Sequence, residues 1–137
     1  MVRKAVSGLT ALGLIGGAGS VVYNSHGDAT VKIKDASGHV QTVQISANHA
    51  KAFSCPTGTH DKVAPLDIKL GRIKLTQQSV RRSELAIEHK YPVNSTPPRA
   101  VLVRYKALLR QDDRLTAAYN ATVDKHNAII DKLCTPE

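Results

Sequence analysis

The sequence predicts a mainly α-helical protein: an antiparallel, coiled-coil-like hairpin of two long helices, with a small N-terminal β-hairpin and a hydrophobic leader or transmembrane helix before it. Three observations predict this fold. Residues 5–23 carry no charge, residues 31–45 show strand-like alternation, and apolar residues recur at helical intervals on both sides of a proline-rich segment. A chain of 137 residues has room for one domain. We divide it into a leader or anchor (1–23), a β-hairpin with a connecting loop (24–60) and a helical hairpin (61–137).

The N-terminal segment has the order of an export signal, because Arg3 and Lys4 precede the uncharged residues 5–23. The uncharged run is also close to the ~20 residues that an α-helix needs to cross a bilayer, so a retained anchor stays an alternative. Five glycines make the run only weakly apolar, and the small residues at 17–20 suit a signal peptidase. The positive charges stay in the cytoplasm in either case. We therefore expect the chain from about Asn24 onward to be extracytoplasmic, either secreted or membrane-anchored.

Two short segments after the leader have the period-two pattern of half-buried strands. Val31 and Ile33 alternate with lysines, and Val43 and Ile45 flank a glutamine. The Asp, Ser and Gly content between them is typical of a turn. We predict a β-hairpin over residues 30–46. Two strands alone are marginally stable in water, so the hairpin must pack on the helices or on another chain.

The rest of the chain predicts two helices joined by a turn. The first has an apolar stripe at Leu66, Leu70, Ile73, Val80 and Ile87. It begins at Asp61 or Pro65 and ends before Pro92, because three prolines exclude a helix through residues 91–98. The second covers residues 99–133, with an apolar face made by Leu102, Tyr105, Leu108, Leu109, Leu115, Tyr119, Val123, Ile129, Ile130 and Leu133. A short connection predicts an antiparallel pair.

The two cysteines flank this predicted hairpin. Cys55 lies just before the first helix and Cys134 just after the second. These ends meet in an antiparallel pair, so we predict an intramolecular disulfide, which an oxidising compartment would allow to form.

The sequence predicts no enzyme, no cofactor and no metal site. Residues 1–23 resemble the signal-arrest-release segments of some phage lysozymes, but no Glu precedes Glu84 to serve as a lysozyme acid. We interpret Glu84 and Glu88 as part of a solvated salt-bridge face near Arg81, Arg82 and Lys90. The six histidines and two cysteines lack the short spacings of metal motifs. No nucleophile elbow or phosphate-binding glycine loop indicates a small-molecule substrate.

Charge is the one functional signal. Between Lys69 and Arg114 eleven basic residues face four acidic ones, whereas the chain after Arg114 has two against three. We expect the turn-proximal part of the hairpin to bind an anionic surface through Arg81, Arg82, Arg99, Arg104, Lys106 and Arg110. Nucleic acid is not expected, because no aromatic residues are interleaved for base stacking.

The sequence thus predicts a small, exported, non-enzymatic envelope or secreted protein. Its basic helical hairpin would contact anionic lipid, a cell-wall polymer or a protein. The alternative is an accessory subunit of a larger membrane complex, held in the membrane by residues 5–23.

Overall fold

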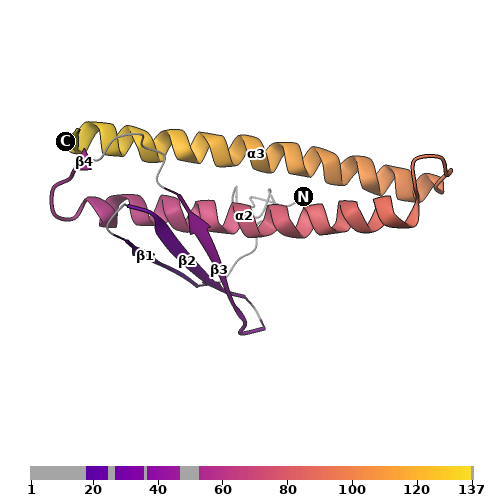
Figure 1. Cartoon of the computed structure of the whole chain (residues 1–137), viewed down its shortest axis with the longest axis horizontal. Helices are drawn as coiled ribbons and strands as arrows, with labels where there is room; N and C mark the ends of the chain where they lie inside the picture. Colours follow the sequence, from indigo (N-terminus) through magenta and orange to yellow (C-terminus); the bar gives the residue numbers. More distant parts are fainter. Residues whose placement is uncertain (1–17, 25–26, 36, 47–52, 137) are drawn as a thin grey trace, which may run out of the picture.

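A computed structural model describes residues 18–24, 27–35, 37–46 and 53–136. It has three layers: a small sheet, a long helix against it, and a second long helix on the far side of the first (Figure 1). The elements are β1 (Gly19–Tyr23), β2 (Ala29–Lys34), β3 (Val40–Ile45), β4 (Phe53–Ser54), α2 (Thr59–Lys90), α3 (Arg99–Leu133) and β5 (Thr135–Pro136). The chain is therefore mainly helical with a small antiparallel sheet, in agreement with the sequence.

The sheet has one strand more than the sequence predicts. Its order is β1-β2-β3, all antiparallel, with Val31 opposite both Val21 and Val43. Strands β2 and β3 confirm the hairpin predicted over residues 30–46. The prediction was wrong for residues 19–23, which were assigned to the apolar leader and instead form the edge strand β1. In β1 alternate residues face the core. This period-two pattern cannot be recognised from the sequence, because the whole run around it is uncharged.

The remainder of the predicted leader, residues 1–17, lies outside the described residues. Within the described part of the chain, the two helices fall short of the apolarity that a bilayer crossing requires.

Helix α2 lies between the sheet and α3. Towards the sheet, Leu70 and Leu75 join a buried cluster with Ala29, Val31, Ile33, Val43 and Ile45. Towards α3, Ile73 and Val80 are buried with Leu115. Gly71 lets the helix approach the sheet closely, because a Cβ atom there would lie 2.6 Å from Val31 Cγ1. A helix covered on two sides has no single apolar stripe, which is why only part of the predicted stripe is fully buried.

The antiparallel helical hairpin is confirmed, and α3 has the predicted bounds. Helix α2 begins at Thr59, earlier than either predicted start, so Pro65 lies inside it. Burial of Val63, which is 1% exposed, stabilises this first part of the helix. The predicted apolar face of α3 was wrong for Leu102 and Leu109, which are 40% and 39% exposed, since α2 covers only part of that face.

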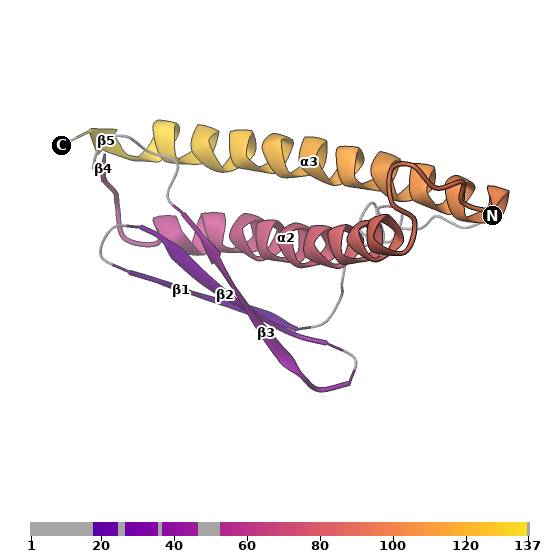
Figure 2. The same cartoon turned by 45° about the vertical axis from the view of Figure 1, so that its right-hand side comes forward.

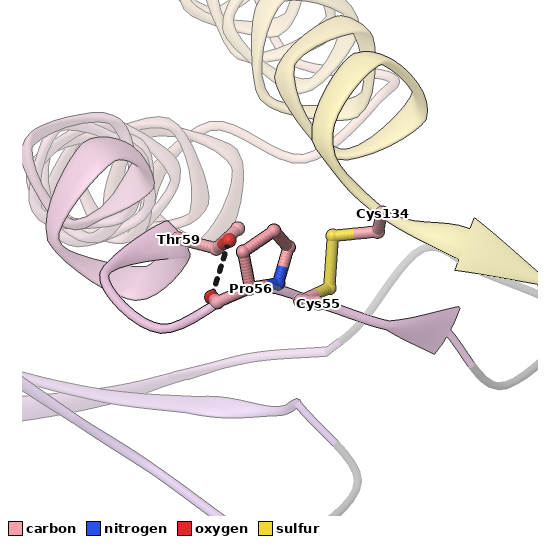
Figure 3. The surroundings of a disulfide bond; sticks show 4 residues. All are labelled: Cys55, Pro56, Thr59 and Cys134. Carbon is pink, nitrogen blue, oxygen red and sulfur yellow. Dashed lines mark hydrogen bonds between the residues drawn. A yellow bond between two sulfur atoms is a disulfide. The ribbon is translucent and has the colours of Figure 1, made fainter.

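The ends of the hairpin are joined as predicted. Cys55 and Cys134 form a disulfide, drawn in Figure 3, and the short strands β4 and β5 pair beside it. The Thr59 hydroxyl donates a hydrogen bond to the Pro56 carbonyl oxygen at 2.7 Å, which fixes the first turn of α2 next to the disulfide. Because disulfides form and persist in oxidising compartments, this bond indicates an extracytoplasmic environment.

Candidate functional site

The end of the hairpin that carries the interhelical turn extends beyond the sheet (Figures 1 and 2). We call residues 79–110 the distal end. Two glutamates stand there against seven basic residues: Arg81, Arg82, Lys90, Arg99, Arg104, Lys106 and Arg110. The disulfide and the sheet lie towards the opposite end, so the distal end is the part of the hairpin that the sheet leaves uncovered.

A groove of about 450 Å³ lies between the two helices at the distal end. It is lined by Ser79, Arg82, Ser83, Ala86, Ile87, Lys90, Tyr91, Val101 and Arg104. The α2 residues among these recur every three or four positions, so they share one side of that helix. We call this feature the distal groove.

The distal groove concentrates positive charge. Arg82 and Lys90 enter from α2 and Arg104 from α3, and none of them forms an ion pair with a residue that the structure describes. Lys90 Nζ lies 5.7 Å from the centroid of the Tyr91 ring, within the range of a cation–π contact. Like charges held close together without counter-charges favour an anionic ligand. The Ser79 hydroxyl in the lining adds hydrogen-bonding capacity, whereas the Ser83 hydroxyl donates to the Ser79 carbonyl oxygen at 3.3 Å.

The distal groove contains only part of the predicted basic site. Arg82 and Arg104 line it, whereas Arg81 Nε lies 3.5 Å from Asp112 Oδ2 and is partly neutralised. The other three cations, Arg99, Lys106 and Arg110, are exposed on α3 outside the groove. Lys90 was missing from the predicted site, although its spacing of eight from Arg82 places both on one helix side.

The solvated acidic face predicted at Glu84 and Glu88 is only half correct. Glu88 is exposed and accepts a hydrogen bond from the Tyr105 hydroxyl at 2.8 Å. Glu84 is only 8% exposed, because it faces α3, and its Oε2 atom has no hydrogen-bond partner. Burial, and then the charge of Asp112, raises the pKa of Glu84.

A second polar cluster lies inside the molecule, where β1, α2 and α3 meet. The Tyr23 hydroxyl donates to Asp67 Oδ2 at 2.6 Å, and His126 Nε2 lies 3.4 Å from the same oxygen. Asp67 is 2% exposed, so its carboxylate relies on these partners. The hydrogen bond to Asp67 raises the pKa of His126, and burial raises the pKa of Tyr23. Three elements are thereby joined through one buried carboxylate.

This buried cluster was missed by the sequence analysis. Tyr23 had been assigned to the leader, Asp67 was not singled out, and His126 was considered as one of six histidines without a metal-binding spacing. No three His, Cys, Asp or Glu side chains converge in the described ranges as metal ligands would. Because the cluster is buried and links β1, α2 and α3, we interpret its role as structural, and the exposed distal groove is the stronger candidate site.

Comparisons with protein-family models, with curated proteins and with solved structures find no match for this chain.

Proposed function

We propose that this chain is a small, exported, non-enzymatic protein that uses the distal end of its helical hairpin to bind an anionic partner. The observation that carries the proposal is that Arg82, Lys90 and Arg104 line one groove and form no ion pair with any residue in the described ranges. The disulfide and the sheet support this role, because they make a stiff stalk whose free end presents the charge.

The position of β1 supports secretion over a retained anchor. The antiparallel pairing of β1 with β2 begins at Gly19, which lies opposite Ile33. Residues 5–18 are the uncharged residues that remain before it, and as a helix they would cover roughly 20 Å, less than the ~30 Å of a hydrocarbon core. Their length fits the apolar region of a cleavable signal, and Gly16 and Ala18 are small residues at suitable spacing. The proposed mature chain begins at about Gly19.

The mature N-terminus tests the export part of the proposal. Intact mass of material isolated from the native medium is expected to correspond to a chain that begins within a residue or two of Gly19. Recovery of Met1 in washed membranes would instead support the alternative, an anchored accessory subunit.

A charge-matched pair of variants tests the binding part. The groove variant replaces Arg82, Lys90 and Arg104 with Gln. The control replaces Lys62, Lys125 and Lys132, three exposed cations at the disulfide end, and has the same net charge. Binding to soluble polyphosphate is measured at low and physiological salt, because surface electrostatics weakens with ionic strength.

The groove variant is expected to lose at least tenfold in affinity and most of the salt dependence, while the control stays within about twofold of the original chain. Equal losses in both variants would show that only net charge matters, and the site assignment would then be wrong.

A further inference from the structure

The solvent-facing side of α3 at the distal end combines cations with exposed apolar side chains. The residues Arg99, Leu102, Val103, Lys106, Leu109 and Arg110 follow one another at helical intervals, and all are exposed. We call these six residues the outer face of α3. Val103 is 58% exposed, and no acidic residue occurs in α3 before Asp112. The outer face therefore offers both positive charge and apolar surface.

Exposed apolar side chains are concentrated in this part of the protein. Among the described residues, five of the seven exposed large apolar side chains lie between residues 85 and 109. One of them, Val93, lies in the interhelical turn and is fully exposed. Scattered exposed leucines are ordinary, but a group of them on one end of a molecule indicates a binding surface.

We propose that the outer face of α3 docks on the surface of an anionic lipid bilayer. This inference rests on the proposed function and names the anionic partner. Leucine and valine side chains at the headgroup boundary bury apolar area, while the neighbouring lysine and arginines extend towards lipid phosphates. A hydrated wall polymer would pair with the cations but leave the apolar side chains in water.

A second copy of the chain fits the outer face less well than a bilayer. In a two-fold symmetric contact the same patch meets itself, which brings the cations Arg99, Lys106 and Arg110 of one copy close to the cations of the other. Like charges pressed together across an interface oppose binding. An anionic bilayer supplies the opposite charge over the whole patch.

The absence of Trp from the chain permits a site-specific test. Val103→Trp introduces a single fluorophore on the outer face, and Val40→Trp introduces one on β3, where the native valine is also 58% exposed. Each purified chain is mixed with vesicles of neutral lipid, with vesicles containing one-third phosphatidylglycerol, and with soluble polyphosphate. Circular dichroism verifies that both variants are folded.

The expected result is that the Val103→Trp emission shifts to the blue with anionic vesicles but not with neutral vesicles or polyphosphate. The Val40→Trp emission should not shift under any of the three conditions. Replacing Arg99, Lys106 and Arg110 with Gln in the Val103→Trp chain should weaken vesicle binding on the order of a hundredfold, about fivefold for each cation. Bilayer insertion of the N-terminal segment alone would shift neither fluorophore and would not respond to these substitutions.

Three results would overturn the inference, and they separate it from the proposed function. Binding to polyphosphate without a vesicle-induced shift would leave the proposed function standing and remove the bilayer. Binding to neither would remove both. A Val103→Trp emission that is already blue-shifted without lipid, together with a dimeric mass, would assign the outer face to a second copy.

Discussion

Removing the disulfide should cost this protein much of its stability. Cys55 and Cys134 are 79 residues apart in sequence, and closing a loop of that size restricts the unfolded chain. The loop-closure entropy corresponds to about 4.5 kcal/mol at 25 °C. Domains of ordinary size have a total unfolding free energy of about 5–15 kcal/mol. The reduced chain should therefore lie near the limit of folding.

The assay is urea unfolding of the oxidised chain, the reduced chain and the Cys55→Ala/Cys134→Ala variant, followed by circular dichroism at 222 nm. The midpoint should fall by roughly 2 M urea in the two forms without the bond, taking a slope typical of a small domain. Hydrogen exchange should show that the amides beside the former bond, in β5 and at the start of α2, lose protection first. A loss below about 1 kcal/mol would refute the reasoning, since loop-closure entropy predicts several times that value.

Three further predictions concern single side chains. Gly71→Ala should lower the unfolding free energy by about 1–2 kcal/mol, because overpacking of the new methyl group against Val31 outweighs the gain in helix propensity. A rise in melting temperature would contradict the close approach of α2 to β2. The hydrogen bond to Asp67 raises the pKa of His126, so the stability that protonated His126 contributes to the fold is complete below pH ~6.5 and is lost as the pH rises through the raised pKa. Between pH 5 and 8, the melting temperature should therefore fall less steeply with pH in His126→Gln than in the original chain. Parallel plots of melting temperature against pH for the two chains would exclude the ion pair. Burial raises the pKa of Glu84, so ionisation of this side chain destabilises the fold as the pH rises above ~4.5. Glu84→Gln should therefore be more stable than the original chain at pH 7 but not at pH 4. An equal difference in stability at the two pH values would show that the carboxyl is not buried.

The sequence by itself determined the two helices, the β2–β3 hairpin and the disulfide. Each of these depends on local or nearly local signals. Three prolines end one helix before the next begins, and alternating valines and isoleucines define the hairpin strands. Once the helices are antiparallel, Cys55 and Cys134 must lie close together, because they flank the two ends that meet. The excess of positive charge at the distal end was likewise visible from residue counts.

Only the tertiary structure decided which side chains act together. β1 was hidden because its alternation is embedded in an uncharged run, and its place in the sheet depends on pairing with β2. The sequence of α2 alone suggests that Glu84 lies at the surface, but in the folded chain α3 covers it. The groove cations Arg82, Lys90 and Arg104 come from two helices, so their convergence depends on the relative register of α2 and α3, which the disulfide and the side chains packed between the helices set, and no local pattern encodes that register.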